Sequence, residues 1–286
     1  MISEALAMPF FQRALVVGVL VSVACGVVGT FVVVKRISSI SGGLSHAAFG
    51  GVGLGHFLGI SPMLGAAGFC LAAAVGIGAV YRTRQEALDS LISMVWALGM
   101  AVGMLFIAFT PGYAGELTSY LFGSILFVPP EYLSIVVVLD VLVLFVVVAF
   151  FKELHAVAFD EEFSEIVGLP VGLLFTLLLC LSALVVVVLI RIAGVILTIA
   201  LLTTPAVIAR QWCHSLPRMM LLASVLTAFA NTMGLFLAFW LSERWAVEAP
   251  TGPLIIVLVM VIYGVSSALR GICSARQMRL VGVDGV

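Results

Sequence analysis

The sequence has little charge and almost no lysine. Only 9% of its 286 residues are Asp, Glu, Lys or Arg, and the only lysines are Lys35 and Lys152. Soluble domains carry about 25% charged residues, so a soluble enzyme or a disordered chain is a poor interpretation. The formal net charge is −1, without a run of like charges that would indicate nucleic-acid binding. With 63% apolar residues and a mean hydropathy of +1.31, the composition indicates an integral membrane protein.

The sequence also lacks motifs for chemistry. A phosphate-binding P-loop needs GxxxxGK followed by Ser or Thr, but Lys35 follows Val34 and Lys152 follows Phe151. If ATP drives this protein, another subunit must bind the nucleotide. The five cysteines form no CxxC pair, and three lie inside apolar runs, which is typical of small packing residues and implies no disulfide framework.

The apolar runs predict about nine membrane spans, with eight or ten as alternatives. A span needs about 20 apolar residues, so residues 1–286 form a single transmembrane domain. The first run is too long for a signal peptide and lacks a convincing cleavage site. A further apolar piece, 119–128, is too short to cross and is expected to be re-entrant or interfacial. The expected spans are 14–34, 44–60, 62–81, 88–110, 132–151, 170–190, 192–210, 219–241 and 252–269.

The positive residues predict the orientation of these spans. With the N-terminus outside, ten of the 13 Lys and Arg residues fall on the cytoplasmic side and three fall outside. Cytoplasmic loops are normally enriched in Lys and Arg. The sequence therefore predicts an all-α membrane protein, a multi-span helical bundle with its N-terminus out and its C-terminus in.

Two expected helices have unusual compositions. Residues 38–55 are rich in glycine and serine, and Gly42, His46, Gly50 and Gly53 share one helical face. Such a helix can approach its neighbours closely, but its polar groups are costly at membrane depth unless they face a cavity or a partner. In the second helix, residues 194–210, Pro205 is expected to break or kink the helix near its cytoplasmic end.

The longest polar stretch, 152–170, is expected to be cytoplasmic. Asp160 can cap the N-terminus of a short helix at about 160–168, which Gly168 and Pro170 would end. This segment is either a solvated connector or a docking helix for a cytoplasmic partner, and spacing alone leaves both open. In the second case the partner-docking residues are Asp160, Glu161, Glu162, Phe163 and Gly168.

Four stretches in the same order carry a family resemblance. They are KRISSISGGLSHAAFGGVGLGHFLGI, RQEALDSLISMVWALGMAVGML, FDEEFSEIVGLPVG, and the pair GVILTIALLTTPAVIAR and EAPTGPLIIVL. Together they resemble the permease subunits of ABC importers for zinc, manganese and iron.

The resemblance implies the fold of a type II ABC importer transmembrane subunit, similar to the vitamin B12 permease, in a bacterial plasma membrane. It implies a homodimer around a central pathway, ATP-binding subunits docked on the cytoplasmic coupling helices, and an extracytoplasmic metal-binding protein that delivers the ion. The chain itself would be a transport subunit without a cofactor, and not an enzyme.

One position departs from the family pattern. The acidic residue that the family has four positions before His46 is Gly42 here. Imidazole nitrogens suit Zn²⁺ better than the oxygen-preferring Mn²⁺, which favours zinc weakly over manganese or iron.

The expected site residues follow from this pattern. The metal candidates are His46, then His56 near the outer end of the same span, and Asp140, an ionisable residue in mid-span that could compensate for Gly42 or serve packing. The translocation pathway is expected to include Ser41, Gly42 and Ser45. The alternatives are an ion-coupled secondary transporter acting alone, which usually shows repeated broken helices, and a structural subunit of a membrane complex.

Overall fold

The computed structural model describes residues 6–82, 88–110, 123, 125–126, 128–245 and 250–280, and within these ranges every regular element is a helix. The expected all-α class is therefore confirmed. The expected piece 119–128 lies mostly outside the described residues. The helices are α2 (Pro9–Val34), α3 (Ser39–Phe57), α4 (Pro62–Tyr81), α5 (Leu88–Ala108), α7 (Glu131–Ala149), α8 (Phe151–Phe159), α9 (Glu161–Ile166), α10 (Val171–Trp212), α11 (Leu216–Trp245) and α12 (Thr251–Leu280).

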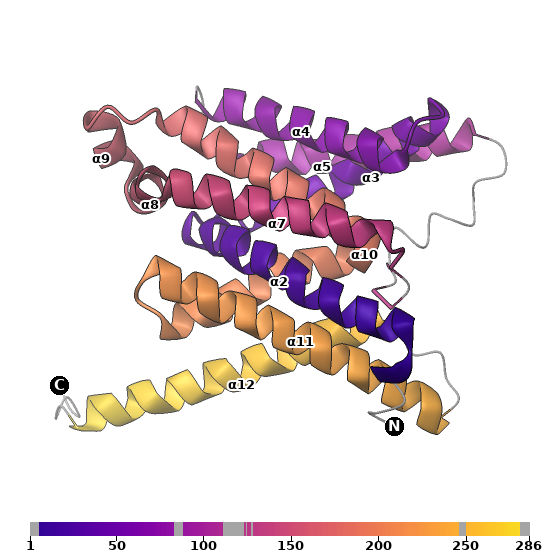
Figure 1. Cartoon of the computed structure of the whole chain (residues 1–286). Helices are drawn as coiled ribbons and strands as arrows, with labels where there is room; N and C mark the ends of the chain where they lie inside the picture. Colours follow the sequence, from indigo (N-terminus) through magenta and orange to yellow (C-terminus); the bar gives the residue numbers. More distant parts are fainter. Residues whose placement is uncertain are drawn as a thin grey trace.

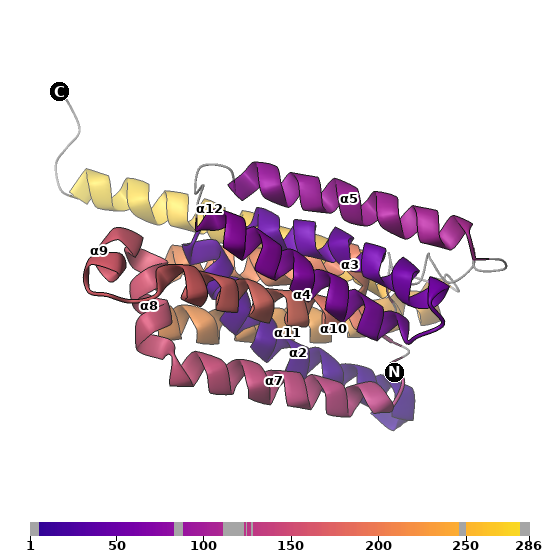
Figure 2. The same cartoon turned by 90° about the horizontal axis from the view of Figure 1, so that it is seen from above.

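The long helices lie side by side as a bundle, and the start of α2 and the end of α12 lie at opposite ends of it (Figure 1). Helix α2 is central, because it packs against α7, α10 and α11. Helix α3 packs against α4 and α5. In the view from above, α5 and α7 lie on opposite sides of the bundle (Figure 2). The short helices α8 and α9 lie at one end, which we call the α9 end (Figure 1).

Helix α10 changes direction at Gly194, which has non-helical angles (φ 79°, ψ 167°) that glycine adopts at low cost. Near the start of α10, the Phe175 ring lies 5.8 Å from the Lys35 ammonium nitrogen. Near its end, Arg210 donates a hydrogen bond to the Val33 carbonyl oxygen at 3.1 Å. A straight helix of 42 residues would be about 63 Å long, yet both ends of α10 lie beside the same end of α2. The helix therefore crosses the bundle and returns.

Seven of the described helices are long and apolar enough to cross a membrane: α2, α4, α5, α7, α10, α11 and α12. Two features account for the difference from the expected nine. The expected spans 170–190 and 192–210 both lie in α10, and the expected span 44–60 corresponds to α3, whose serines and glycines reduce its hydropathy.

Two local expectations differ from the structure. Helix α10 does not break at Pro205, because the helix continues to Trp212 and its interruption lies at Gly194. The polar stretch 152–170 holds two helices, since α8 precedes the expected short helix. Leu154 and Val157 are buried and hold α8 against the bundle. This packing depends on the tertiary structure, so the sequence of residues 152–159 did not predict a helix there.

Candidate functional site

Helix α3 meets α5 through glycine backbones. A Cβ atom at Gly50 would lie 2.6 Å from the Gly99 carbonyl oxygen, and one at Gly53 would lie 2.7 Å from the Gly103 carbonyl oxygen. Contacts this short exclude any side chain at these positions. The expectation that this helix approaches its neighbours closely is confirmed.

The opposite side of α3 meets α4 in the same manner. A Cβ atom at Gly51 would lie 2.4 Å from the Gly65 carbonyl oxygen, and one at Gly65 would lie 2.3 Å from the Gly51 carbonyl oxygen. Helix α3 is thus held between α4 and α5 by backbone-to-backbone contact on two sides.

His46 lies at the α3–α5 contact, one turn before Gly50. Its ring stacks on Trp96 of α5, with 4.4 Å between the centroids and 7° between the planes. Its Nδ1 atom lies 3.3 Å from the Met100 sulfur. The ring is half-buried, so the imidazole is oriented by two neighbours while part of it stays accessible.

The expected pathway residues around His46 are buried. The Ser41 hydroxyl donates to the Ser38 carbonyl oxygen at 2.7 Å, and the Ser45 hydroxyl oxygen has no hydrogen-bond partner among the described residues. A Cβ atom at Gly42 would lie 3.5 Å from the Trp96 ring, which is ordinary contact. His56 is partly buried near the other end of α3.

Asp140 lies apart from His46. It is buried on α7 beside Ala24 and Cys25 of α2, and its Oδ1 atom has no hydrogen-bond partner within the described part of the chain. His46 instead faces α5, on the other side of the bundle (Figure 2). Within one chain the structure therefore does not bring Asp140 to the position where Gly42 lacks a carboxylate.

No group of three or more His, Cys, Asp or Glu side chains converges to hold a metal ion among the described residues. The imidazole nitrogen of His46 and the thioether sulfur of Met100 lie 3.3 Å apart and form one possible ligand pair. One chain thus offers one nitrogen and one sulfur donor at this point.

Helix α9 forms where the short helix was expected. The Asp160 carboxylate accepts a hydrogen bond from the Phe163 N–H at 2.9 Å, which confirms the expected N-cap. The helix ends before Gly168, whose φ of +88° is the left-handed conformation common just after a helix. Phe163, Ile166 and Val167 are 60%, 83% and 61% exposed, so α9 presents an uncovered apolar face.

The acidic residues of α9 point in different directions. Glu162 and Glu165 are exposed, whereas Glu161 contacts Lys35 and Tyr81, at the ends of α2 and α4. Of the expected docking residues, Glu161 is thus turned toward its own bundle, and the others lie on the outside.

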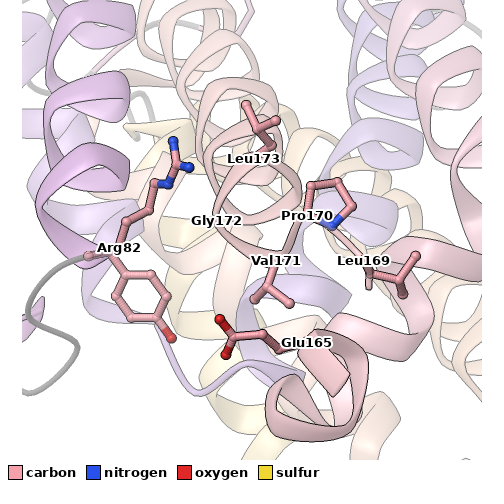
Figure 3. A pocket seen from close by; sticks show the side chains of 8 residues that line it. Arg82, Glu165, Leu169, Pro170, Val171, Gly172 and Leu173 are labelled. Carbon is pink, nitrogen blue, oxygen red and sulfur yellow. The ribbon is translucent and has the colours of Figure 1, made fainter. Parts of the chain in front are cut away.

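A pocket of about 290 Å³ opens beside α9, between the end of α4 and the start of α10. Arg82 and Glu165 lie on different walls of it, and the Arg82 guanidinium points away from the Glu165 carboxylate (Figure 3). The Arg82 side chain packs over Gly172, where a Cβ atom would lie 2.5 Å from Arg82 Cγ. The pocket therefore adjoins the surface of α9 through Glu165.

Comparison with known proteins agrees with this arrangement. The model of the ABC 3 transport family matches residues 7–270. An uncharacterized membrane protein of Synechocystis is 40% identical over 93% of each chain. A manganese transport system membrane protein of Listeria innocua is 33% identical over 80% of this chain and 82% of that protein. The solved structure of PsaBC from Streptococcus pneumoniae in complex with a Fab matches with a TM-score of 0.80 and 30% identity, covering 93% of this chain and 95% of that one.

The helical bundle with its glycine-packed α3 and exposed α9 is that of an ABC transporter permease subunit. The chain belongs to the ABC 3 transport family. It is an integral protein of the bacterial plasma membrane and not an enzyme, since ATP hydrolysis belongs to a separate subunit.

Sequence reasoning missed several residues of these two regions. Trp96 and Met100 were not singled out, although they lie four residues apart on the helix whose Gly99 and Gly103 contact Gly50 and Gly53 of α3. Lys35, one of only two lysines, was counted for orientation but not for a specific contact.

Proposed function

We propose that this permease imports a divalent transition metal, Zn²⁺ in preference to Mn²⁺, by alternating access in a homodimer. Metal import is supported by family membership and by relatives named as manganese transport system membrane proteins. The choice of zinc depends on the donor atoms at His46, which are the observation that carries this proposal.

The donors beside His46 are nitrogen and sulfur. Imidazole and thioether groups are borderline or soft ligands that suit Zn²⁺, whereas Mn²⁺ prefers carboxylate, carbonyl and water oxygens. Gly42, one turn before His46, supplies no carboxylate. A pathway also needs only weak contacts, because tight binding would slow release. Manganese is the second candidate, favoured by the names of the relatives.

A second copy of the chain would complete the ligand set. One chain contributes a single imidazole and a single thioether at this point, and the described residues add no third strong ligand. The half-buried His46 ring leaves an edge that a symmetry-related His46 could complement. His56 and Asp140 are proposed as further contacts of the ion along its path.

The proposed topology has nine crossings with the N-terminus outside. It counts α3 and treats α10 as two spans that meet at Gly194. The α9 end is then the cytoplasmic side, to which the expected orientation assigns ten of the 13 Lys and Arg residues.

The partners follow from this topology. The exposed apolar face of α9, with Asp160, Glu162 and Gly168 around it, would dock the ATP-binding subunit on the cytoplasmic side. An extracytoplasmic metal-binding protein would deliver the ion at the opposite end. ATP binding and hydrolysis would move α9, and α3 would shift against α4 and α5 to open one side at a time.

The test is metal uptake in liposomes that hold this chain with its ATPase and binding protein. We expect ATP-dependent Zn²⁺ uptake that falls at least about tenfold in His46→Ala, with His155→Ala, at an exposed position on α8, as a control. Asp140→Asn is expected to lower uptake without loss of folded protein. Uptake of Mn²⁺ but not Zn²⁺ would support the second candidate, and uptake on an ion gradient without the ATPase would indicate a secondary transporter instead.

A further inference from the structure

The carboxylate of Glu161, the first residue of α9, contacts residues at the ends of two other helices. The Tyr81 hydroxyl at the end of α4 lies 2.9 Å and 2.7 Å from its two oxygens. The Lys35 ammonium, just after α2, forms an ion pair with it and also donates to the Val157 carbonyl oxygen of α8 at 2.9 Å. One side chain of α9 is therefore bonded to the ends of α2 and α4 and, through Lys35, to α8.

The Phe175 ring packs beside both Tyr81 and Lys35 and so holds this contact in position. The Phe175 ring of α10 stacks on Tyr81 with 4.0 Å between the centroids, and lies 5.8 Å from the Lys35 ammonium nitrogen. The side chains of Lys35 and Glu161 are only 6% and 22% exposed. Charges withdrawn from water in this way interact strongly, and removal of one leaves the other uncompensated. The contact is thus more rigid than an ion pair on the surface.

Lys35 also adjoins the start of α3. Only residues 36–38 separate it from Ser39, and Arg36 in this turn has a φ of 59°, which non-glycine residues rarely adopt. A turn this short and this constrained passes a displacement of Lys35 to the first residue of α3. The helix that carries His46 is therefore connected to α9 through one ion pair.

We propose that Lys35, Glu161 and Tyr81 form a rigid link that passes motion of α9 to α3, so that ATP hydrolysis is coupled to opening of the pathway. This inference rests on the proposed function, in which α9 docks the ATPase. Lys35 and Glu161 are positioning residues, because they touch neither the metal nor the nucleotide. The outer side chains of α9 hold the partner, and Glu161 holds the helix to the bundle.

The link has a specific consequence for transport. Without it, the ATPase still docks on Phe163 and Ile166 and still hydrolyses ATP, but α9 moves without carrying α3. The quantity that changes is the number of metal ions imported per ATP hydrolysed, while binding of the ATPase stays unchanged.

The experiment measures this ratio in liposomes with the complete transporter. We expect Lys35→Met and Glu161→Gln to lower ions per ATP at least about tenfold. The matched controls Lys152→Met and Glu131→Gln change the same chemical groups at exposed positions outside α9 and should keep the ratio of the wild type. A normal ratio in folded Lys35→Met and Glu161→Gln would overturn the proposal.

Conservative variants separate coupling from folding. Lys35→Arg keeps the charge and should keep most of the ratio, and the exchange Lys35→Glu with Glu161→Lys should restore part of what each single reversal loses. If these two variants fold and bind the ATPase but show no recovery, the link is not what couples α9 to α3.

A readout without metal separates this proposal from the proposed function. Spin labels at Ser38 and Glu162, both exposed, would report the distance between the start of α3 and α9 in the ATPase complex, with and without trapped nucleotide. In the wild type the two labels should move together and keep a narrow distance distribution, whereas Glu161→Gln should broaden it. An unchanged distribution would overturn the link even where metal import holds, and a broadened one would support it even where metal import fails.

Discussion

Helix α3 and helix α9 are both held by other helices, but by opposite means. Helix α3 lies between α4 and α5 with glycine backbones in direct contact and few hydrogen bonds from its side chains. Helix α9 is held by a carboxylate, an ammonium and a hydroxyl. Glycine surfaces carry no interlocking side chains, so they allow sliding along the contact, whereas a buried charge contact is directional. Under the proposed function, α3 would be the helix that shifts, and α9 would be the helix that must stay fixed to the bundle.

The largest expected effect tests the backbone contact of α3. In Gly65→Ala the new Cβ would lie 2.3 Å from the Gly51 carbonyl oxygen, so α3 and α4 must separate. Overpacking of this kind costs about 1–3 kcal/mol, and we expect a value at the upper end because backbone cannot repack. The measurement is the thermal unfolding midpoint of the purified protein in detergent.

Gly68→Ala is the matched control on the same helix. Nothing lies within 4 Å of a Cβ atom at Gly68, and alanine is a better helix former than glycine. We expect unchanged or slightly raised stability. Equal unfolding midpoints for the two variants would mean that α3 is not held by backbone contact.

The next effect tests the metal preference proposed for the site on α3. Gly42→Asp restores an oxygen donor one turn before His46, and a Cβ atom there makes only ordinary contacts, at 3.5 Å from Trp96 and 3.9 Å from Ile199. We expect the ratio of Mn²⁺ to Zn²⁺ uptake to rise about tenfold, equivalent to about 1.4 kcal/mol. Gly42→Ala fills the same space without a carboxylate and should leave the ratio unchanged. A rise in both variants would assign the effect to shape and not to the oxygen donor.

A smaller effect tests α9 by itself. Asp160→Ala removes the acceptor for the Phe163 N–H, and loss of an N-cap costs about 1 kcal/mol. In a helix of six residues this should raise amide hydrogen exchange over 161–166 about fivefold. Asp160→Asn keeps an acceptor oxygen and should exchange as the wild type does. If Asp160→Ala exchanges no faster, the Glu161 contacts alone maintain α9.

The same contrast explains what the sequence predicted. The glycines of α3 at helical spacing predicted that this helix approaches its neighbours closely, because a glycine face has no side chains to hold two backbones apart. The structure shows that these neighbours are α4 and α5. The cap at Asp160 and the stop at Gly168 are also local signals, and both were placed correctly. The apolar runs located the long helices, because a segment that crosses the lipid must be apolar and must satisfy its backbone hydrogen bonds as a helix.

The Lys35–Glu161 contact could not be predicted in this way. The two residues are 126 positions apart. They meet because the ends of α2 and α4 pack beside the start of α10, where Phe175 contacts both Lys35 and Tyr81. Nor did the sequence separate Asp140 from His46, since hydropathy says which residues are in the membrane but not which helices are neighbours. The sequence predicted the interruption of α10 at Pro205, because proline disfavours a helix interior. It lies at Gly194 instead, since a glycine is compatible with both a helix and a turn and its sequence does not say which.

The smallest effect tests whether α9 is held to the bundle by the charge of the Lys35–Glu161 ion pair or by the shape of its contacts. Burial lowers the pKa of the Lys35 ammonium to about 8, and the groups that face it are the Glu161 carboxylate, the Tyr81 hydroxyl, the Val157 carbonyl and the Phe175 ring. The positive charge is therefore present below about pH 8 and is lost as the pH rises through that value.

A group with that pKa is half neutral at pH 8, so we expect metal ions imported per ATP to fall by about half between pH 7 and pH 8. The opposing Glu161 carboxylate favours the ammonium, so any displacement of this midpoint is toward higher pH. Lys35→Arg keeps its charge throughout this range, because the guanidinium pKa exceeds 12, and its ratio should stay flat. A decline of the same size in Lys35→Arg would place the titrating group elsewhere in the transporter. A flat wild-type profile from pH 7 to pH 10 would mean that α9 is held by the shape of its contacts, as α3 is, and the contrast between the two helices would fail.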